Sequence, residues 1–327
     1  MERKTPKYNS MPHYIKYLFC CLTLIISING ANAQELFILN DAATPMPKGV
    51  WGVRGQVEYY EEGTAQRYMT SVRLMYGAFS KTSIYLTLTG SNHHGSKLED
   101  DFISHTHSGS GLAPEYPFAF AGIHLFGKYS FLSLDEQNRH FRMAAYGAIS
   151  SSNAAHDETE PRLMDDTSGG ELGLITTWLN KRFAVSLTLG GILPLAYTET
   201  QFPNTIYERD VELQFGRAVK YNLSFGYLLY PKKYKDYEQA NYNAYVEFLG
   251  KAFEDAVVLF DGEPQELQTA FLRQGHYVEM HLGIQKIIRS KSRIELSVGF
   301  SLINEALIHQ TPIVNLAYQV FLFKERK

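Results

Sequence analysis

The fold is decided by two stretches, WGVRGQVEYY over Trp51–Tyr60 and RIELSVGFSL over Arg293–Leu302. In both, one set of alternate residues is apolar or aromatic, apart from Gly55 in the first stretch, and every charged residue falls in the other set. Side chains alternate between two faces along an extended strand. Each stretch therefore predicts a strand with one apolar face and one charged face.

The same alternation, bounded by turn residues, recurs as far as Phe323. It predicts fourteen antiparallel strands, at 49–60, 67–79, 82–91, 117–131, 140–151, 169–179, 182–194, 208–217, 220–230, 241–253, 255–261, 275–288, 292–303 and 312–323. Short periplasmic turns are expected at 80–81, 132–139, 180–181, 218–219, 254 and 289–291, and long external connections at 92–116, 152–168, 195–207, 231–240 and 262–274. This asymmetry is typical of an all-β, up-and-down transmembrane β-barrel. Omitting the short segment 255–261 and merging one neighbour predicts twelve strands, the alternative.

A secretory signal is expected at the start of the chain. Four basic residues precede the apolar run Leu18–Ile28, and Ala31-Asn32-Ala33 then supplies a cleavage site. The run is too short for a spanning helix, which needs about 20 apolar residues. Both cysteines, Cys20 and Cys21, lie in this run, so the mature chain is expected to contain no disulfide and no thiolate.

Four regions follow from these patterns. We expect a cleaved signal peptide over 1–33, a periplasmic N-terminal segment over 34–48, a single barrel domain over 49–323 and a tail over 324–327. The predicted location is the outer membrane of a Gram-negative bacterium.

Composition excludes two classes of protein. The full chain has a formal net charge of −3, and loss of four basic residues and one acid with the signal makes the mature chain more acidic. A nucleic-acid-binding protein would show a basic stripe instead. A mean hydropathy of −0.22 without a long apolar run excludes a helical membrane protein but allows a barrel, in which alternation cancels. The 22 tyrosines and 20 phenylalanines suit the aromatic girdles of a barrel.

The two faces of the predicted strands separate by charge. The lipid-facing sets carry none: Ala119, Ala121, Ile123, Leu125, Gly127 and Tyr129; Phe141, Met143, Ala145, Gly147 and Ile149; Phe183, Val185, Leu187, Leu189 and Leu193. The opposite parity supplies the candidates for lining the lumen, namely Arg54, Glu58, Arg73, His124, Lys128, Arg142, Glu171, Glu212, Glu247, Glu279, His281, Arg293 and Glu295. A secreted β-sandwich also alternates, but the signal, the aromatic content and the loop asymmetry favour the barrel.

Several architectural motifs carry a family resemblance. They are Phe37-Ile38-Leu39-Asn40 through Lys48-Gly49-Val50, the stretch from Ala154-Ala155-His156-Asp157 to Asp165-Asp166, Ser224-Phe225-Gly226-Tyr227, and Gly283-Ile284-Gln285 followed by Arg293–Val298. With these motifs the chain resembles uncharacterised outer-membrane β-barrel proteins of the transporter-like group related to the proteins of meta-pathway phenol degradation. The resemblance implies a barrel over most of the mature chain, and movement of a small molecule across the outer membrane.

Two predicted external loops contain residues able to bind a metal ion. Imidazole and carboxylate groups bind Zn²⁺ or Cu²⁺, and clustered carboxylates bind Ca²⁺. The candidates are His93, His94, His105, His107, His156 and Asp157. The competing interpretation is a polar loop surface, because the spacing of the acidic residues is not that of an EF-hand loop.

These features predict a channel or transporter for a small solute. The alternative is a closed barrel that acts through its external loops as a surface binding or structural protein, because mixed lumenal charges also pair and fill a small barrel. No nucleophile, base and orienting partner form a recognisable triad, so no enzymatic activity is expected. No cofactor and no nucleic acid are expected. The expected partners are outer-membrane lipid, lipopolysaccharide, the outer-membrane assembly machinery and the small solute.

Overall fold

The computed structural model describes residues 36–93, 95, 97–98, 102–103, 115–153, 168–233, 238–268, 272–305 and 311–323. These residues form sixteen β-strands. No described helix is both long and apolar enough to cross a membrane.

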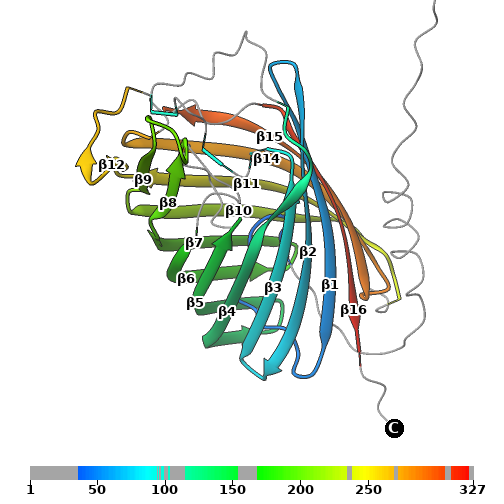
Figure 1. Ribbon diagram of the computed structural model, residues 1–327. Helices are drawn as coiled ribbons and strands as arrows, with labels where there is room; N and C mark the ends of the chain where they lie inside the picture. Colours follow the sequence, from blue (N-terminus) through cyan, green and yellow to red (C-terminus); the bar gives the residue numbers. More distant parts are fainter. Residues whose placement is uncertain are drawn as a thin grey trace, which may run out of the picture.

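Twelve of the strands close into one antiparallel barrel (Figure 1). Around the ring they are β1 (Trp51–Glu62), β16 (Ile313–Leu322), β15 (Ser292–Asn304), β14 (Gly275–Ile288), β11 (Asn241–Phe253), β10 (Ala218–Tyr230), β7 (Phe183–Pro194), β6 (Gly169–Asn180), β5 (Arg139–Ser152), β4 (Ala119–Glu136), β3 (Thr82–Ser91) and β2 (Ala65–Phe79). The first and last strands close the ring, with Trp51 opposite Leu322 and Tyr59 opposite Val314. The all-β transmembrane barrel is thus confirmed, with the twelve strands of the alternative prediction.

The other four strands form a separate sheet in the order β13-β12-β9-β8. They are β8 (Tyr197–Gln201), β9 (Arg209–Gln214), β12 (Val257–Phe260) and β13 (Glu263–Pro264), within two of the long connections. Their apolar side chains share a core with residues of the 92–118 connection: Leu98, Phe102, Val211, Leu213, Phe215, Ala256, Val258 and Leu272. The strands predicted at 208–217 and 255–261 therefore exist, but they lie outside the barrel. Six and four residues are too few to cross a bilayer, which needs about nine to eleven.

Because these two strands lie outside the ring, some connections lie at the opposite end of the barrel from the one predicted. Tyr230, the last residue of β10, is paired with Tyr242, and the preceding Tyr227 is paired with Phe183 beside the short turn at 181–182. The connection 231–240 therefore lies at the end with the short turns, and its prediction as an external loop is wrong. Residues 218–219 begin β10 and Glu254 follows β11 at the opposite end, so neither is a periplasmic turn.

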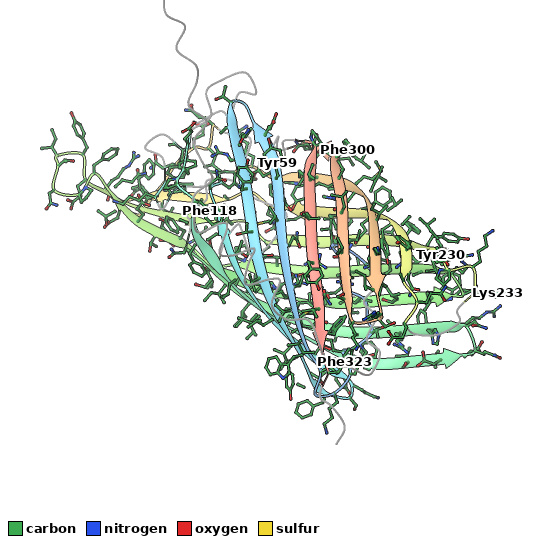
Figure 2. All side chains as sticks on the ribbon, turned by 90° about the vertical axis from the view of Figure 1, so that its right-hand side faces the viewer. Tyr59, Phe118, Tyr230, Lys233, Phe300 and Phe323 are labelled. Carbon is green, nitrogen blue, oxygen red and sulfur yellow. The ribbon has the colours of Figure 1, made fainter. Side chains whose placement is uncertain are left out.

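The outward face of the barrel is apolar, with large exposed side chains such as Leu172, Leu187, Leu189 and Leu296. Aromatic pairs lie near both ends of the strands: the rings of Tyr59 and Tyr68 are 5.1 Å apart, and those of Trp51 and Tyr76 are 4.4 Å apart. In Figure 2, Tyr59, Phe118 and Phe300 lie toward one end of the barrel and Tyr230 toward the other. Such girdles mark the two membrane interfaces.

A β-bulge corrects one of the predicted lipid-facing sets. The register shifts between Thr89 and Gly90, which pair with Gly122 and Phe120, so the intervening Ala121 has no partner on β3. Ala121 is buried, whereas Phe118 and Phe120 are exposed. Because one extra residue inverts the alternation, the predicted parity holds from Ile123 onward and fails at Ala121.

Candidate functional site: a lumen crossed by the N-terminal segment

Residues 36–50 lie inside the barrel, as the blue segment within the ring of strands in Figure 1 shows. The side chains of Phe37, Ala43 and Met46 are almost fully buried, at 1%, 0% and 3% exposure. The prediction of a periplasmic segment over 34–48 is corrected by this placement for residues 36–48. An irregular backbone in a membrane protein needs hydrogen-bond partners from protein or water, and the polar inner wall supplies them.

Glu247 of β11 holds the start of this segment. Its carboxylate accepts hydrogen bonds from the backbone N–H groups of Ile38 at 2.9 Å, Leu39 at 3.0 Å and Asn40 at 3.0 Å. The hydroxyl of Ser224 donates a fourth, at 3.0 Å. Glu247 is 1% exposed, so these four donors take the place of the water molecules that would otherwise bind its carboxyl oxygens. We call this contact the Glu247 latch.

The rest of the segment contacts the opposite wall. The backbone N–H of Ala43 donates to the hydroxyl of Thr177 at 2.8 Å, and that of Met46 donates to Ser83 at 2.8 Å. At its end Gly49 and Gly77 are hydrogen-bonded through backbone groups, 2.7 Å apart. From β11 to β2 the segment thus crosses the full width of the lumen, in the half nearer the short turns.

Charged side chains reinforce this arrangement. The ammonium of Lys128 donates to the carbonyl of Ala42 at 2.7 Å and lies 3.7 Å from the carboxylate of Asp41. Arg73 lies 3.9 Å from the same carboxylate, and Arg142 donates to the hydroxyl of Thr44 at 3.1 Å. Lys128, Arg73 and Arg142, all predicted from the sequence to line the lumen, therefore hold the segment.

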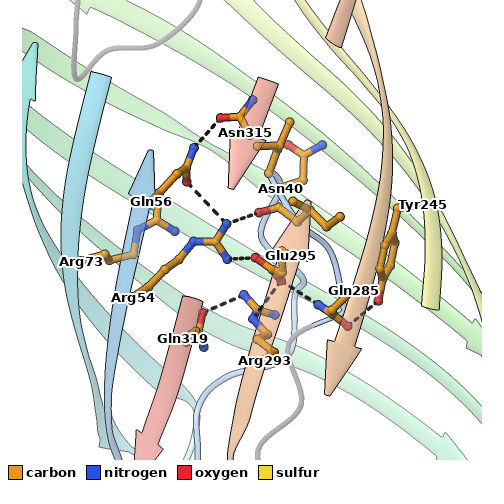
Figure 3. Close-up of polar contacts among 12 residues, drawn as sticks. Asn40, Arg54, Gln56, Arg73, Tyr245, Gln285, Arg293, Glu295, Asn315 and Gln319 are labelled. Atoms are coloured by element: carbon orange, nitrogen blue, oxygen red, sulfur yellow. Dashed lines mark hydrogen bonds and ion pairs between the residues drawn. The ribbon is translucent and has the colours of Figure 1, made fainter. Parts of the chain in front are cut away.

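A network of charged and amide side chains fills the wall formed by β1, β16, β15, β14 and β11 (Figure 3). Arg54 pairs with Glu295 and donates to the carbonyl of Ile38 at 2.7 Å. Glu295 also pairs with Arg293 at 3.0 Å and accepts from Gln285 at 2.7 Å. These groups are buried, with opposite charges paired, so this side of the lumen is filled by side chains.

A cavity of about 120 Å³ remains on the other side of the lumen. Leu39, Asn40 and Asp41 form part of its lining, and wall residues Arg73, Thr87, His124, Phe126, Tyr146, Glu171, Ile175, Thr188, Lys220, Asn222 and Leu249 form the remainder. Lys220 pairs with Glu171 at 2.5 Å, and Tyr146 donates to the same carboxylate. The volume suits a few water molecules or a small solute.

The structure places the sequence-predicted lumenal residues in three groups. Arg54, Arg73, Lys128, Arg142 and Glu247 contact the N-terminal segment; His124 and Glu171 line the cavity; Glu58, Glu279, His281, Arg293 and Glu295 are buried on the inward face of β1, β14 and β15. His281 lies 3.0 Å from Glu279. The prediction that Glu212 lines the lumen is wrong, because this residue belongs to β9 of the separate sheet and not to the barrel wall.

Sequence reasoning missed the role of the N-terminal segment. The signal was present in Phe37-Ile38-Leu39, three apolar residues in the stretch predicted to be a periplasmic segment. Apolar side chains at this position indicate a buried segment.

Of the candidate metal ligands, only His93 lies within the described residues, where its ring packs edge-on against Tyr60 at 5.4 Å. His94, His105, His107, His156 and Asp157 lie outside them. Among the described residues no group of three or more metal-binding side chains is present.

A comparison with solved structures finds proteins with a similar fold. The crystal structure of the COG4313 outer membrane channel from Pseudomonas putida F1 superimposes with a TM-score of 0.55 and 12% identity, over 88% of this chain and 100% of that one. The NanC porin and the β domain of the Bordetella autotransporter BrkA each give a TM-score of 0.42, at 9% and 10% identity, over 84% of this chain and 100% and 99% of theirs. At the level of sequence, no family profile and no curated protein matches. The likeness to the Pseudomonas protein establishes an outer-membrane-type barrel fold.

Proposed function

We propose that this protein is an outer-membrane channel for a small polar solute, closed by its own N-terminal segment. The observation that carries the proposal is the Glu247 latch, because one lumenal carboxylate holds three consecutive backbone N–H groups of a segment that crosses the lumen. If the barrel were permanently closed by the side chains of its own wall, no separate segment would be needed to close the lumen. The segment precedes β1 and is joined to the barrel at one end, so its movement opens the lumen without disturbing the strand ladder.

The direction of passage follows from the topology. Short turns face the periplasm in barrels of this type, so the segment occupies the periplasmic half of the lumen. The cavity lies on its external side, since Glu171 and Lys220 belong to the ends of β6 and β10 nearer the long connections. A solute from outside reaches the cavity first and passes when the segment withdraws toward the periplasm.

The cavity lining favours a polar solute. Arg73, His124, Lys220 and Asn222 present charged or hydrogen-bonding groups, and Asn40 and Asp41 add two more from the segment. The relation to the transporter-like group suggested by the sequence agrees with this role, and so does the fold of the Pseudomonas channel.

Planar-bilayer conductance tests the proposal. Purified, refolded mature protein is compared with a variant in which Phe37–Asp41 is replaced by glycine and serine, so that the length is kept and the packed side chains are lost. We expect rare openings in the original and frequent openings in the variant. Silence of both at every voltage, with correct folding shown by heat-dependent gel migration, would refute a channel.

A second function is supported by a specific observation. The separate sheet β8-β9-β12-β13 has its own buried core at the end with the long connections, where Leu213 and Val258 are almost fully buried. A folded external module suits a closed barrel that binds a partner at the cell surface. Deleting the module distinguishes the two functions, because conductance of the segment variant is retained only if the barrel itself is the functional part.

A further inference from the structure

Charge is distributed unequally between the two ends of the barrel. Among the described residues at the short-turn end, the cations are Lys48, Lys81, Arg139, Lys181, Arg182, Lys232, Lys233, Lys286, Arg289 and Lys291, against the carboxylates Asp135, Glu136 and Glu238. The opposite end is acidic, with carboxylates on β8, β9, β13 and the connections of the separate sheet. A basic rim at a membrane interface attracts anionic lipid headgroups.

One part of this rim faces lipid directly. Lys286 is exposed on the outward face of β14. Its neighbours on this face are Ile284 of the same strand, which is 58% exposed, and Ile294, the residue opposite it on β15, which is 44% exposed. Its ammonium lies 5.4 Å above the ring centre of Tyr242, the residue opposite it on β11. Lys286 forms no ion pair with any residue that the structure describes. Within the described part of the chain it is thus a cation without an anionic partner, on an apolar outward surface.

Further polar groups lie on β10, the strand next to β11, and in the connection that follows it. Tyr230, 53% exposed, ends β10 opposite Tyr242, with the two rings 6.3 Å apart at 64°. The exposed Lys232 and Lys233 follow at once in the longest connection of this end, and Figure 2 shows Lys233 beside Tyr230. Lysine ammonium groups are point charges suited to phosphate, and tyrosine hydroxyls donate hydrogen bonds at this depth of a membrane.

We propose that Tyr230, Lys232, Lys233, Tyr242 and Lys286 form a binding site for the phosphate of an anionic phospholipid in the periplasmic leaflet. The shared chemistry of the ligand is a phosphate anion. The source is a lipid and not free phosphate, because Lys286 lies among exposed isoleucines that acyl chains cover. The site is independent of the channel function, since its side chains are exposed on the outer surface of the barrel.

Native mass spectrometry of the refolded mature protein in micelles measures the site. Phosphatidylglycerol and phosphatidylcholine with the same acyl chains are titrated separately. We expect at least tenfold tighter retention of phosphatidylglycerol. Lys286→Gln should weaken that retention about fivefold, the effect of one cation near an anionic lipid surface, and leave phosphatidylcholine unchanged. Combined with Lys232→Gln and Lys233→Gln it should abolish the preference.

Lys181→Gln is the matched control, because it removes a cation of the same rim in the turn between β6 and β7. It should leave retention of phosphatidylglycerol unchanged. Equal retention of the two lipids by the original protein would overturn the proposal. An equal loss of phosphatidylglycerol retention in Lys181→Gln would also overturn it, because it would indicate a general electrostatic attraction by the whole basic rim. Displacement of the lipid by inorganic phosphate at the lipid's own concentration would do the same. If Lys286→Gln fails to fold, Lys232→Gln/Lys233→Gln in the exposed connection tests the same site, and an unchanged preference for phosphatidylglycerol in that variant would overturn it.

Discussion

The Glu247 latch makes a quantitative prediction for Glu247→Gln. The substitution keeps the shape of the side chain but removes its charge and turns one oxygen into an NH₂ group. The oxygen that accepts from Ile38 and Leu39 can be retained as a neutral acceptor, whereas the N–H of Asn40 then faces a donor. A hydrogen bond to a charged group contributes about 1.5–3 kcal/mol, a neutral one about 1, and an unsatisfied buried donor costs about 1–3 kcal/mol.

These values favour release of the segment by about 2–4 kcal/mol. Since about 1.4 kcal/mol is a factor of ten in an equilibrium, the released population should rise about 30-fold to 1,000-fold. The strand ladder is unaffected, so the barrel should stay folded and heat-modifiable. The channel should therefore open far more often in planar bilayers.

Cysteine labelling provides an independent assay of the same event. Both cysteines of the chain, Cys20 and Cys21, precede the predicted cleavage site. In a protein that starts at Gln34, Ala43→Cys therefore introduces a single thiol at a fully buried position of the segment. Labelling by a small maleimide should be faster in the Glu247→Gln background by the same factor. Glu279→Gln is the control, because Glu279 is equally buried but lies beside His281. Equal labelling rates in the Glu247→Gln, Glu279→Gln and unsubstituted backgrounds would refute the latch.

Other parts of the molecule lead to three further predictions. Leu187→Arg places a charge on the outward face and should cost about 2–4 kcal/mol near the midplane; reduced heat-modifiable protein in outer-membrane fractions is the readout, and normal assembly would contradict the parity. Gly77→Ala adds a Cβ that overlaps the carbonyl of Pro47, so it should loosen the end of the segment and raise labelling at Ala43→Cys without unfolding the barrel. Leu213→Asp buries a charge in the separate sheet, where Leu213 is fully covered; proteolysis should then cut the connections around β9 while the barrel core resists, and an unchanged digestion pattern would argue against an independent core.

Strand placement could be predicted well because it depends on a local repeat. Leu187 and Leu296 lie on the outward face and Arg142 and Glu279 on the inward face, as alternation requires. Ala121 departs from it, because a bulge inserts one residue and the pattern of small residues around Gly122 gives no sign of the shift. The number of strands in the ring differs from the fourteen of the main prediction for a related reason. The segments 208–217 and 255–261 alternate like barrel strands, and only their pairing with each other shows that they form a separate sheet.

The candidate site was predictable in its residues but not in its arrangement. The charges of Arg73, Lys128, Arg142 and Glu247 placed them on the inward face, and that face indeed meets a polar partner. That partner is a backbone segment separated from Glu247 by about two hundred residues, as its bonds to Ile38, Leu39 and Asn40 show. No local pattern carries information over such a separation.

By itself the sequence determined the class of fold and the two faces of the wall, because a period of two is a property of neighbouring residues and the bilayer favours it at every strand. Tertiary structure alone decided the number of strands in the ring, the end at which 231–240 lies, and the closure of the lumen by residues 36–50. These three depend on which strands pair and on where the barrel closes, and closure between β1 and β16 is settled only once the whole ladder has formed. The unpaired N–H groups of the N-terminal segment then find their acceptors inside the barrel, because the polar inner wall is complete only when the ring is.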